Sequence, residues 1–444
     1  MTGYKKIVFA LNLHPGVKPI LVGFLVLFLP GCGTHKVEMT YPSVSADRID
    51  SLILRKNYFK ARELFEQEVQ EISPYQQRLF EAYLGNVFNR PGDSNGSIDV
   101  LFSEYEKELS DSLKAELMEI QSQNCMKLQD YEKAAAITTR QLEEYQHLYT
   151  AEELVSMKNT LQIWKGLVDQ PIQKLDIPGR QVIPLTRDKA GLSNLPVTFG
   201  EDSLGFIFDT GANISTVTAS TAQAMGMRML DASFTVKAIS GIDVSSGLAI
   251  APSFLIGGIL IENAVFLVLP DSALTFPQID YRILGIIGYP VMAAMKEIQL
   301  VKGSSLIVPA RSSSTSIRNM AIEFLTPLIQ LPSEEDTLVF KFDTGADGTT
   351  LYRDYYLRHK EKVESTYTST MIGLGGAGGK AEVEAYKINL PLTINDRQVL
   401  LDSVDLIKEN LTKNENIYGN IGQDLVAKFD TLIINFEEMF ILLK

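Results

Sequence analysis

The stretch Phe206-Ile207-Phe208-Asp209-Thr210-Gly211-Ala212 decides the fold of this 444-residue chain. It is an apolar strand that runs directly into an Asp-Thr-Gly-Ala turn, and it recurs as Val339-Phe340-Lys341-Phe342-Asp343-Thr344-Gly345-Ala346. A single copy would say little, because aspartate and glycine are common where a strand ends in an ordinary turn. Two copies, each behind an apolar strand, indicate a pair of carboxylates that the fold brings to one site.

The two copies belong to a longer repeat with a constant spacing. The pairs that are 134 residues apart are Asp209 and Asp343, Gly241 and Gly375, Gly285 and Gly419, and Gly288 and Gly422. Strand-like alternation, punctuated by Gly, Pro, Asn and Asp, continues from about residue 180 to the end of the chain. The pattern predicts a duplicated all-β unit, with lobe one at 180–310 and lobe two at 318–444, joined by the Ser-rich link 311–316.

Paired Asp-Thr-Gly turns suit acid–base chemistry. Two carboxylates brought almost into contact cannot both ionise cheaply, so the pair keeps one proton over a wide pH range. One carboxylate can then activate a water while the other donates a proton to the substrate. Glycine allows a close approach of the partner loop, and the threonine hydroxyl can hydrogen-bond across to it. The predicted catalytic pair is Asp209 and Asp343, supported by Thr210, Gly211, Ala212, Thr344, Gly345 and Ala346.

These motifs resemble those of the retropepsin-like aspartic proteases. That family combines the Asp-Thr-Gly-Ala strand end with a glycine-rich flap and an apolar-apolar-Gly element before a helix. The corresponding residues here are Ile286-Ile287-Gly288 and Asn420-Ile421-Gly422, with flap candidates Gly241, Gly373, Gly375 and Gly376. The resemblance implies an aspartic-type endopeptidase without a cofactor, which hydrolyses peptide or protein substrates in a cleft between the lobes. It is closer in lobe two, although Asn420 stands where the family usually has an aliphatic residue.

The alanine that ends each motif predicts the pH range of activity. Pepsin-type enzymes tend to have Ser or Thr there, and its hydroxyl donates to the carboxylate and favours the charged form. Ala212 and Ala346 lack that donor, which should raise the pKa values of the pair. We therefore expect an activity optimum nearer to mildly acidic or neutral pH than that of pepsin.

Residues 46–170 carry a helical pattern instead. Candidate helices lie at 46–56, 74–88, 113–128 and 151–167. The segments that follow the first three contain Ala61, Ser97 and Ala134, spaced by 36 and 37 residues. This spacing resembles the tetratricopeptide repeat, without its Trp-Leu-Gly signature, and a generic array of helical hairpins is the alternative. Either array would offer a concave face for a protein partner. The predicted fold class is therefore multi-domain α + β.

The first 31 residues predict an export signal. Their apolar run, 19–30, is too short to span a bilayer comfortably and ends in Leu29-Pro30-Gly31-Cys32. That sequence resembles the bacterial lipobox, which implies lipidation of Cys32, and residues 32–45 would form a tether. A plain secretory signal or an N-terminal anchor is the alternative. The lipobox implies a membrane-anchored protein of the bacterial cell envelope, and Gly33 in place of Asp favours the outer membrane.

Charge and composition argue against several other functions and sites. The net charge of −13 argues against a nucleic-acid partner. Only Cys32 and Cys125 are present, so lipidation of the first leaves no intramolecular disulfide. The histidines have no metal-ligand spacing, and we predict no metal centre. Two further hypotheses remain open: a non-catalytic lipoprotein whose protease-like fold binds peptides, and lobes that pair with those of another copy.

Overall fold

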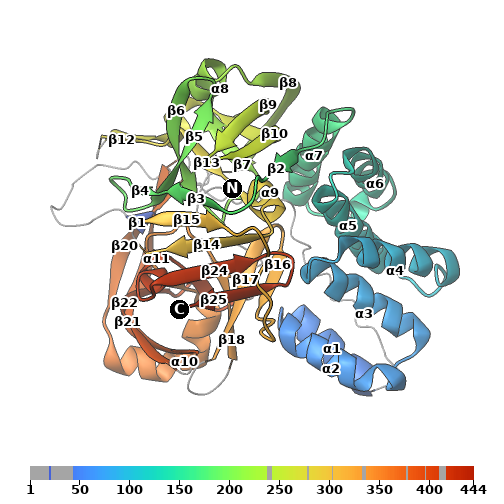
Figure 1. Ribbon diagram of the computed structural model, residues 1–444. Coiled ribbons are helices and arrows are strands. Elements are labelled where there is room, and N and C mark those ends of the chain that lie inside the picture. The colour runs from blue at the N-terminus through green and yellow to red at the C-terminus, as the bar shows by residue number, and fades with distance from the viewer. Residues whose placement is uncertain are drawn as a thin grey trace, which may run out of the picture.

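A computed structural model describes residues 20–21, 44–237, 243–277, 280–302, 304–332, 337–376, 379–395, 397–409 and 417–444. A helical region lies beside a β region that contains two nine-stranded sheets (Figure 1). The fold is thus a mixture of helices and sheets. Four features predicted above fall outside the described residues: Cys32, Gly241, almost all of the signal peptide and nearly the whole tether.

Seven helices form the described N-terminal region. They are α1 Val44–Leu54, α2 Tyr58–Glu68, α3 Pro74–Val87, α4 Pro91–Glu104, α5 Asp111–Lys127, α6 Tyr131–Glu144 and α7 Ala151–Leu167, with short 3₁₀ turns at Val69–Glu71 and Gln146–Leu148. Capping boxes at Ser73 and Thr150 satisfy the first backbone N–H groups of α3 and α7. Helix α1 begins two residues earlier than predicted, because Ser45 and Ala46 are already buried in the helix packing.

Small residues set the helix spacing. The helices pack in sequential pairs, α1 with α2, α3 with α4, and α5 with α6. A Cβ added at Gly85 of α3 would lie 3.0 Å from the Cβ of Ser94 in α4, so the glycine permits this close packing. Cys125 is a free, buried cysteine in α5, and burial raises the pKa of its thiol to about 11.

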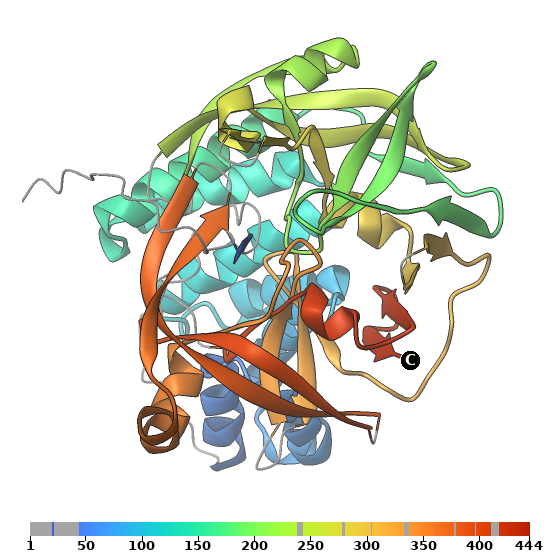
Figure 2. The same ribbon diagram turned by 90° about the vertical axis from the view of Figure 1, so that its left-hand side faces the viewer.

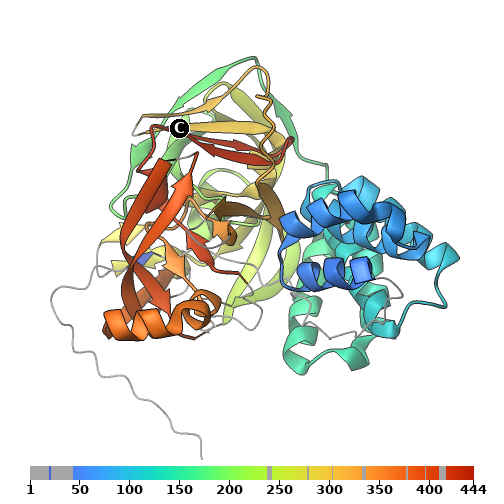
Figure 3. The same ribbon diagram turned by 90° about the horizontal axis from the view of Figure 1, so that it is seen from below.

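The helical region is docked firmly against the β region. Lys56 Nζ and Tyr58 Oη both donate hydrogen bonds to the carboxylate of Glu323, at 3.0 and 2.9 Å. Asn89 Nδ2 donates to the carbonyl of Phe436 at 2.9 Å. Figure 3 shows the helices gathered along one side of the sheets. These contacts hold the helical region in a fixed position against the β region.

The first sheet has the strand order β2-β10-β7-β13-β6-β5-β9-β8, and β4 pairs with β5 at its side. Its strands are β2 Lys174–Asp176, β4 Thr186–Arg187, β5 Ser193–Phe199, β6 Asp202–Phe208, β7 Ser215–Thr218, β8 Arg228–Lys237, β9 Asp243–Ile256, β10 Ile259–Leu269 and β13 Gly285–Ile287. Helix α8 spans Ala219–Ala224, α9 spans Tyr289–Ala294 and a 3₁₀ turn spans Asp271–Leu274, while β11 Thr275–Phe276 pairs with β12 Tyr281–Arg282. The sheet therefore begins at Lys174, six residues before the predicted start of lobe one.

The second sheet has the order β1-β20-β21-β22-β19-β23-β18-β17-β16. Its strands are β1 Ile20–Leu21, β16 Met320–Glu323, β17 Thr326–Pro332, β18 Thr337–Phe342, β19 Thr350–Leu351, β20 Ser369–Gly376, β21 Gly379–Ile394, β22 Arg397–Ile407 and β23 Gly419–Ile421. Helix α10 spans Arg353–Thr366 and α11 spans Gln423–Val426. Five consecutive strands match in the two sheets: β10-β7-β13-β6-β5 and β22-β19-β23-β18-β17.

A smaller five-stranded sheet joins the two halves of the β region. Its order is β25-β24-β14-β15-β3, from β3 Gln181–Pro184, β14 Glu297–Val301, β15 Ser305–Val308, β24 Thr431–Asn435 and β25 Phe440–Leu443. Strand β14 runs antiparallel to β24, with Glu297 opposite Asn435. The buried Glu297 carboxylate accepts hydrogen bonds from the Asn435 amide at 2.8 Å and from the Ser313 N–H at 2.6 Å. The strands of both halves face the viewer in Figure 2, with helices α1 to α7 behind them.

Among the described helices, none is both long and apolar enough to cross a membrane.

Candidate active site

The first Asp-Thr-Gly loop, residues 209–212, leaves β6 at the centre of the first sheet. Strand β13 runs parallel to β6 and aligns Ile287 with Phe208. The backbone N–H of Asp209 donates to the carbonyl of Ile287 at 3.2 Å. Gly211 N–H donates to Asp209 Oδ1 at 2.7 Å. The loop therefore holds the Asp209 carboxylate in a fixed orientation at the end of a central strand.

The second loop, residues 343–346, repeats this arrangement at the end of β18. Strand β23 runs parallel to β18, and Asp343 N–H donates to the carbonyl of Ile421 at 3.0 Å. Gly345 N–H donates to Asp343 Oδ1 at 2.8 Å. Both bonds correspond to those of the first loop at an offset of 134 residues.

The two loops are interlocked through their threonines. Thr210 N–H donates to Thr344 Oγ1 at 3.1 Å, and Thr344 N–H donates to Thr210 Oγ1 at 3.0 Å. Each hydroxyl also donates across the interface, from Thr210 to the carbonyl of Phe342 at 2.7 Å and from Thr344 to that of Phe208 at 2.9 Å. All four bonds lie in buried surroundings, so the two loops form one rigid unit.

The two glycines allow each carboxylate to lie against the opposite loop. A Cβ at Gly211 would lie 2.8 Å from Cγ of Asp343, and a Cβ at Gly345 would collide with the carboxylate of Asp209. No other residue type fits either position without displacing a carboxylate. The structure therefore brings Asp209 and Asp343 together, with the six loop residues singled out by the sequence around them.

Replacing Thr344 by valine tests the interlock. Valine keeps the shape of the side chain but removes one hydroxyl that both donates and accepts a buried hydrogen bond. Because the partner N–H of Thr210 and carbonyl of Phe208 are left unpaired, we expect the free energy of unfolding to fall by about 2–4 kcal/mol. Urea denaturation measures this change. Thr198→Val, at an exposed hydroxyl on β5, is the control, and an equal loss in both variants would contradict the interlock.

Burial dominates the electrostatics of the pair. Asp209 is 0% exposed and Asp343 is 5% exposed. Burial and then the charge of Asp343 raise the pKa of Asp209 well above its usual range. Burial also raises the pKa of Asp343, but an amide donor, Asn420, opposes the rise. Two neighbouring carboxyls with raised pKa values retain a proton into a range where ordinary aspartates are charged.

Asn420 is a site residue that the sequence reasoning missed. The sequence presented it only as a departure from an apolar pair, but its side chain is 2% exposed and Nδ2 donates to Asp343 Oδ2 at 3.0 Å. Its counterpart 134 residues earlier is Ile286, which has no donor. A polar residue in an otherwise apolar strand was the available signal, because buried amides require partners.

A second difference between the loops lies directly after the alanines. Asn213 is buried and accepts a hydrogen bond from Thr326 Oγ1 at 3.0 Å. Its counterpart, Asp347, has a buried Oδ1 with no partner among the described residues, and burial raises its pKa to about 6. The two halves of the site are therefore not equivalent.

The described flap candidates lie on one hairpin. Gly373, Gly375 and Gly376 are in β20, which pairs antiparallel with β21 up to the Gly376–Gly379 pair. Strand β1 pairs parallel to the other edge of β20, with Ile20 opposite Leu374. The hairpin is thus long and glycine-rich at its tip.

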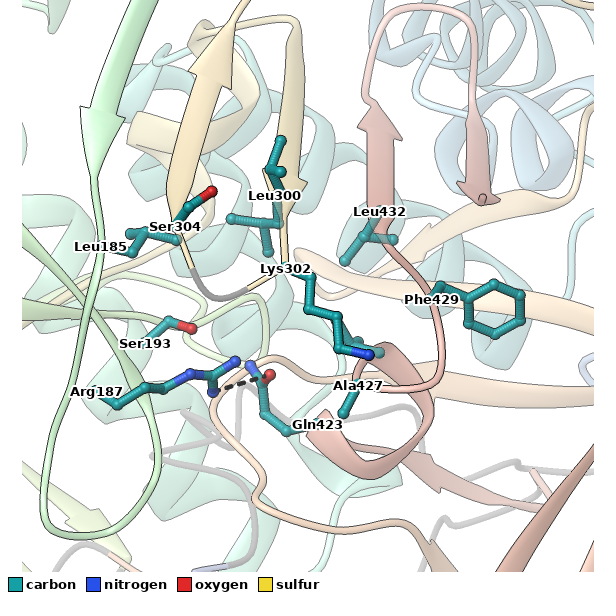
Figure 4. Close-up of a pocket in the computed structure, with 12 residues that line it drawn as sticks. Leu185, Arg187, Ser193, Leu300, Lys302, Ser304, Gln423, Ala427, Phe429 and Leu432 are labelled. Atoms are coloured by element: carbon teal, nitrogen blue, oxygen red, sulfur yellow. Dashed lines mark hydrogen bonds between the residues drawn. The ribbon is translucent and has the colours of Figure 1, made fainter.

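A cavity of about 170 Å³ lies apart from the carboxylates (Figure 4). It is lined by Leu185, Arg187, Ser193, Leu300, Val301, Lys302, Ser304, Gln423, Val426, Ala427, Phe429 and Leu432. Arg187 Nη1 donates to Gln423 Oε1 at 3.2 Å, and Gln423 Nε2 donates to the carbonyl of Thr344 at 2.8 Å. The cavity contains no residue of either Asp-Thr-Gly loop, and its wall supports the second loop through Gln423.

Comparison with known families agrees with this geometry. The family model for aspartyl proteases matches residues 195–291, a span that contains the first loop, β13 and the start of α9. A search of curated proteins finds no match. The match falls on the first half of the β region, and the closer resemblance of lobe two to the family stays a prediction. Residues 195–291 thus carry an aspartyl protease family domain, which suggests a hydrolase that acts on peptides or proteins.

Proposed function

We propose that this chain is an aspartic-type endopeptidase whose catalytic pair is Asp209 and Asp343. The observation that carries the proposal is the reciprocal hydrogen bonding between Thr210 and Thr344, which joins two Asp-Thr-Gly loops around two buried carboxylates. Turns formed only for strand connection would not need two aspartates to meet in a fully buried position, because burying carboxyls costs free energy.

The pair acts on a peptide bond without a covalent intermediate. One ionised carboxylate takes a proton from a water, whose oxygen attacks the carbonyl carbon, while the protonated carboxyl donates to the carbonyl oxygen. The carboxyl that took the proton from water then passes it to the amide nitrogen of the tetrahedral diol, and the C–N bond breaks to give a carboxylic acid and an amine, while a hydroxyl of the diol returns a proton to the other carboxylate. The β20–β21 hairpin, with Gly373, Gly375 and Gly376, serves as a flap that closes over the substrate and excludes water.

The two halves of the β region are duplicated lobes, at about 180–310 and 318–444. The shared strand order around β13 and β23 and the constant offset of the loop hydrogen bonds support this assignment. The lobes together form one site within one chain, as in the pepsins, rather than between two copies.

The helices of residues 46–170 form a tetratricopeptide-like array that binds a protein partner or orients a substrate. Sequential packing of α1 to α6 in pairs supports the array. Docking of the array on the β region, through Lys56, Tyr58 and Glu323, would hold a bound protein at a fixed position relative to the catalytic pair.

The N-terminal segment anchors the enzyme to a membrane. Residues 1–31 act as a lipoprotein signal, and Cys32 receives the lipid, which places the protein in a bacterial cell envelope and, given Gly33, at the outer membrane. Incorporation of a fatty-acid label in cells is the measurement that checks this anchor.

Digestion of a library of extended peptides by the full chain, over about pH 3 to 8, tests the proposed activity. We expect cleavage with a maximum at mildly acidic pH. The singly protonated pair is the active form: activity falls at low pH as the second carboxyl gains a proton, and at high pH as the shared proton is lost. Because burial raises both pKa values, both limits move upward. A maximum near about pH 2 would contradict this electrostatic account, and no cleavage of any peptide would favour a peptide-binding role instead.

A further inference from the structure

The two aspartates differ in the donors that their outer oxygens receive. Asp343 Oδ2 accepts a hydrogen bond of 3.0 Å from Asn420 Nδ2. Asp209 Oδ2 is buried and has no donor among the described residues. The residue that corresponds to Asn420 is Ile286, and both occupy the same register: Ile286 pairs with Ile207, and Asn420 pairs with Lys341. The asymmetry is therefore a substitution within a matched framework.

The amide donor of Asn420 favours the charged form of one of the two carboxyls. An ionised carboxylate only accepts hydrogen bonds, and the Asn420 NH₂ group only donates them. In the structure the amide presents its NH₂ group to Asp343 Oδ2, and its Oδ1 is buried without a partner among the described residues. The opposite orientation would suit only a protonated Asp343. A donor aimed at a carboxylate stabilises the charged form over the neutral form.

The charges around the pair act in the same direction. Lys341, two residues before Asp343 on β18, favours a negative charge on Asp343, and its counterpart in the first sheet is the buried Ile207. The other charged group that faces Asp343 is Asp209 itself. Asp347 directly follows the second loop, and its own charged neighbours are Asp424 and Asp405.

We propose that Asn420 is a positioning residue that keeps the negative charge on Asp343 and the shared proton on Asp209. This inference concerns the same site as the proposed function. The proton-transfer roles assigned below rest on the proposed function. Asp343 takes the proton from water as the oxygen attacks the carbonyl carbon, and Asp209 gives its proton to the carbonyl oxygen. When the C–N bond breaks, Asp343 passes its proton to the leaving amine, and a hydroxyl of the diol returns a proton to Asp209. The pair ends in its starting state.

The first test titrates each carboxyl in the absence of the other. In Asp209→Asn, the remaining Asp343 retains the Asn420 donor; in Asp343→Asn, the remaining Asp209 has no corresponding donor. ¹³C NMR of chains labelled at aspartate Cγ should show that Asp343 titrates about 1–2 pH units below Asp209. Equal or reversed values would overturn the proposal. The measurement needs no proteolysis, so it decides the inference even if the proposed activity fails.

The second test gives position 420 the residue that occupies the equivalent position, 286, in the first half of the site. Asn420→Ile introduces the residue found at position 286, and it should move the acid limb of the kcat/KM profile upward by about 1–2 pH units. The alkaline limb should stay in place. It reports the loss of the Asp209 proton, and Asp343 is charged both before and after that loss. A purely structural role would lower kcat/KM without separating the limbs, and unmoved limbs would overturn the proposal.

Lys341→Ile is the matched control for this second test. It copies Ile207 and removes a nearby charge while leaving the Asn420 hydrogen bond intact. The acid limb should move upward by less than in Asn420→Ile, because Lys341 is partly exposed and its charge is screened. A larger shift in Lys341→Ile would assign the asymmetry to charge rather than to the amide and would overturn the role of Asn420.

Discussion

Asp343→Asn is expected to lower kcat/KM for peptide cleavage by about 10²–10⁴-fold, the range that a positioned general acid or base contributes. Asparagine has nearly the same shape as aspartate but cannot take a proton from water. Because the substitution also removes a charge from a buried position, the free energy of unfolding should stay the same or rise. Loss of activity with retained stability is the signature of a catalytic carboxyl.

Asp209→Asn should lose a comparable factor, since the pair acts as a unit. The control is Asp202→Asn, at an exposed aspartate at the start of the same strand β6, which should leave kcat/KM unchanged. Steady-state kinetics on one peptide and urea denaturation of all three variants make the comparison. Cleavage that survives both substitutions in the pair would show that the active site lies elsewhere.

Gly345→Ala is expected to reduce both stability and activity, because the new methyl group would occupy the space of the Asp209 carboxylate. Overpacking of this kind costs about 1–3 kcal/mol of the free energy of unfolding. Displacing a reacting group by about 1 Å can cost about 10²-fold in rate, so kcat/KM should fall by at least that factor.

The chain offers a matched control three residues further on. A Cβ at Gly348 would meet nothing within 4 Å, so Gly348→Ala should change stability by no more than about 0.5–1 kcal/mol in either direction. Thermal or urea unfolding of the two variants, with kinetics on the same samples, makes the comparison. It separates the collision with the Asp209 carboxylate from the effect of replacing any glycine by alanine. Equal behaviour would mean that the Asp209 carboxylate does not lie against Gly345 in solution.

Local patterns in the sequence predicted much of this architecture. The helical pattern placed α3 and α7 within one residue of their observed bounds, because that signal is confined to each helix. The sequence signals for the strand ends at Asp209 and Asp343 were also local. Their constant offset then suggested that the two loops meet, which the Thr210–Thr344 hydrogen bonds show directly.

Other features depend on contacts between distant segments, and no local pattern identified their partners. The bond from Asn420 to Asp343 exists only because β23 lies parallel to β18, and nothing near residue 420 specifies that neighbour. Likewise, the docking of Lys56 on Glu323 joins residues 267 apart. The sequence marks Asn420 as unusual in its strand, but only the folded arrangement reveals the partner of each of these side chains.

The β14–β24 pairing and the reciprocal threonine bonds both join segments of a single polypeptide. A site assembled from two separate molecules is lost on dilution, because its formation is bimolecular. Here the effective concentration of one half relative to the other is set by the connecting chain and is independent of how much protein is present. The specific activity of the proposed enzyme should therefore be constant down to the lowest enzyme concentrations, because each molecule carries both halves of the site.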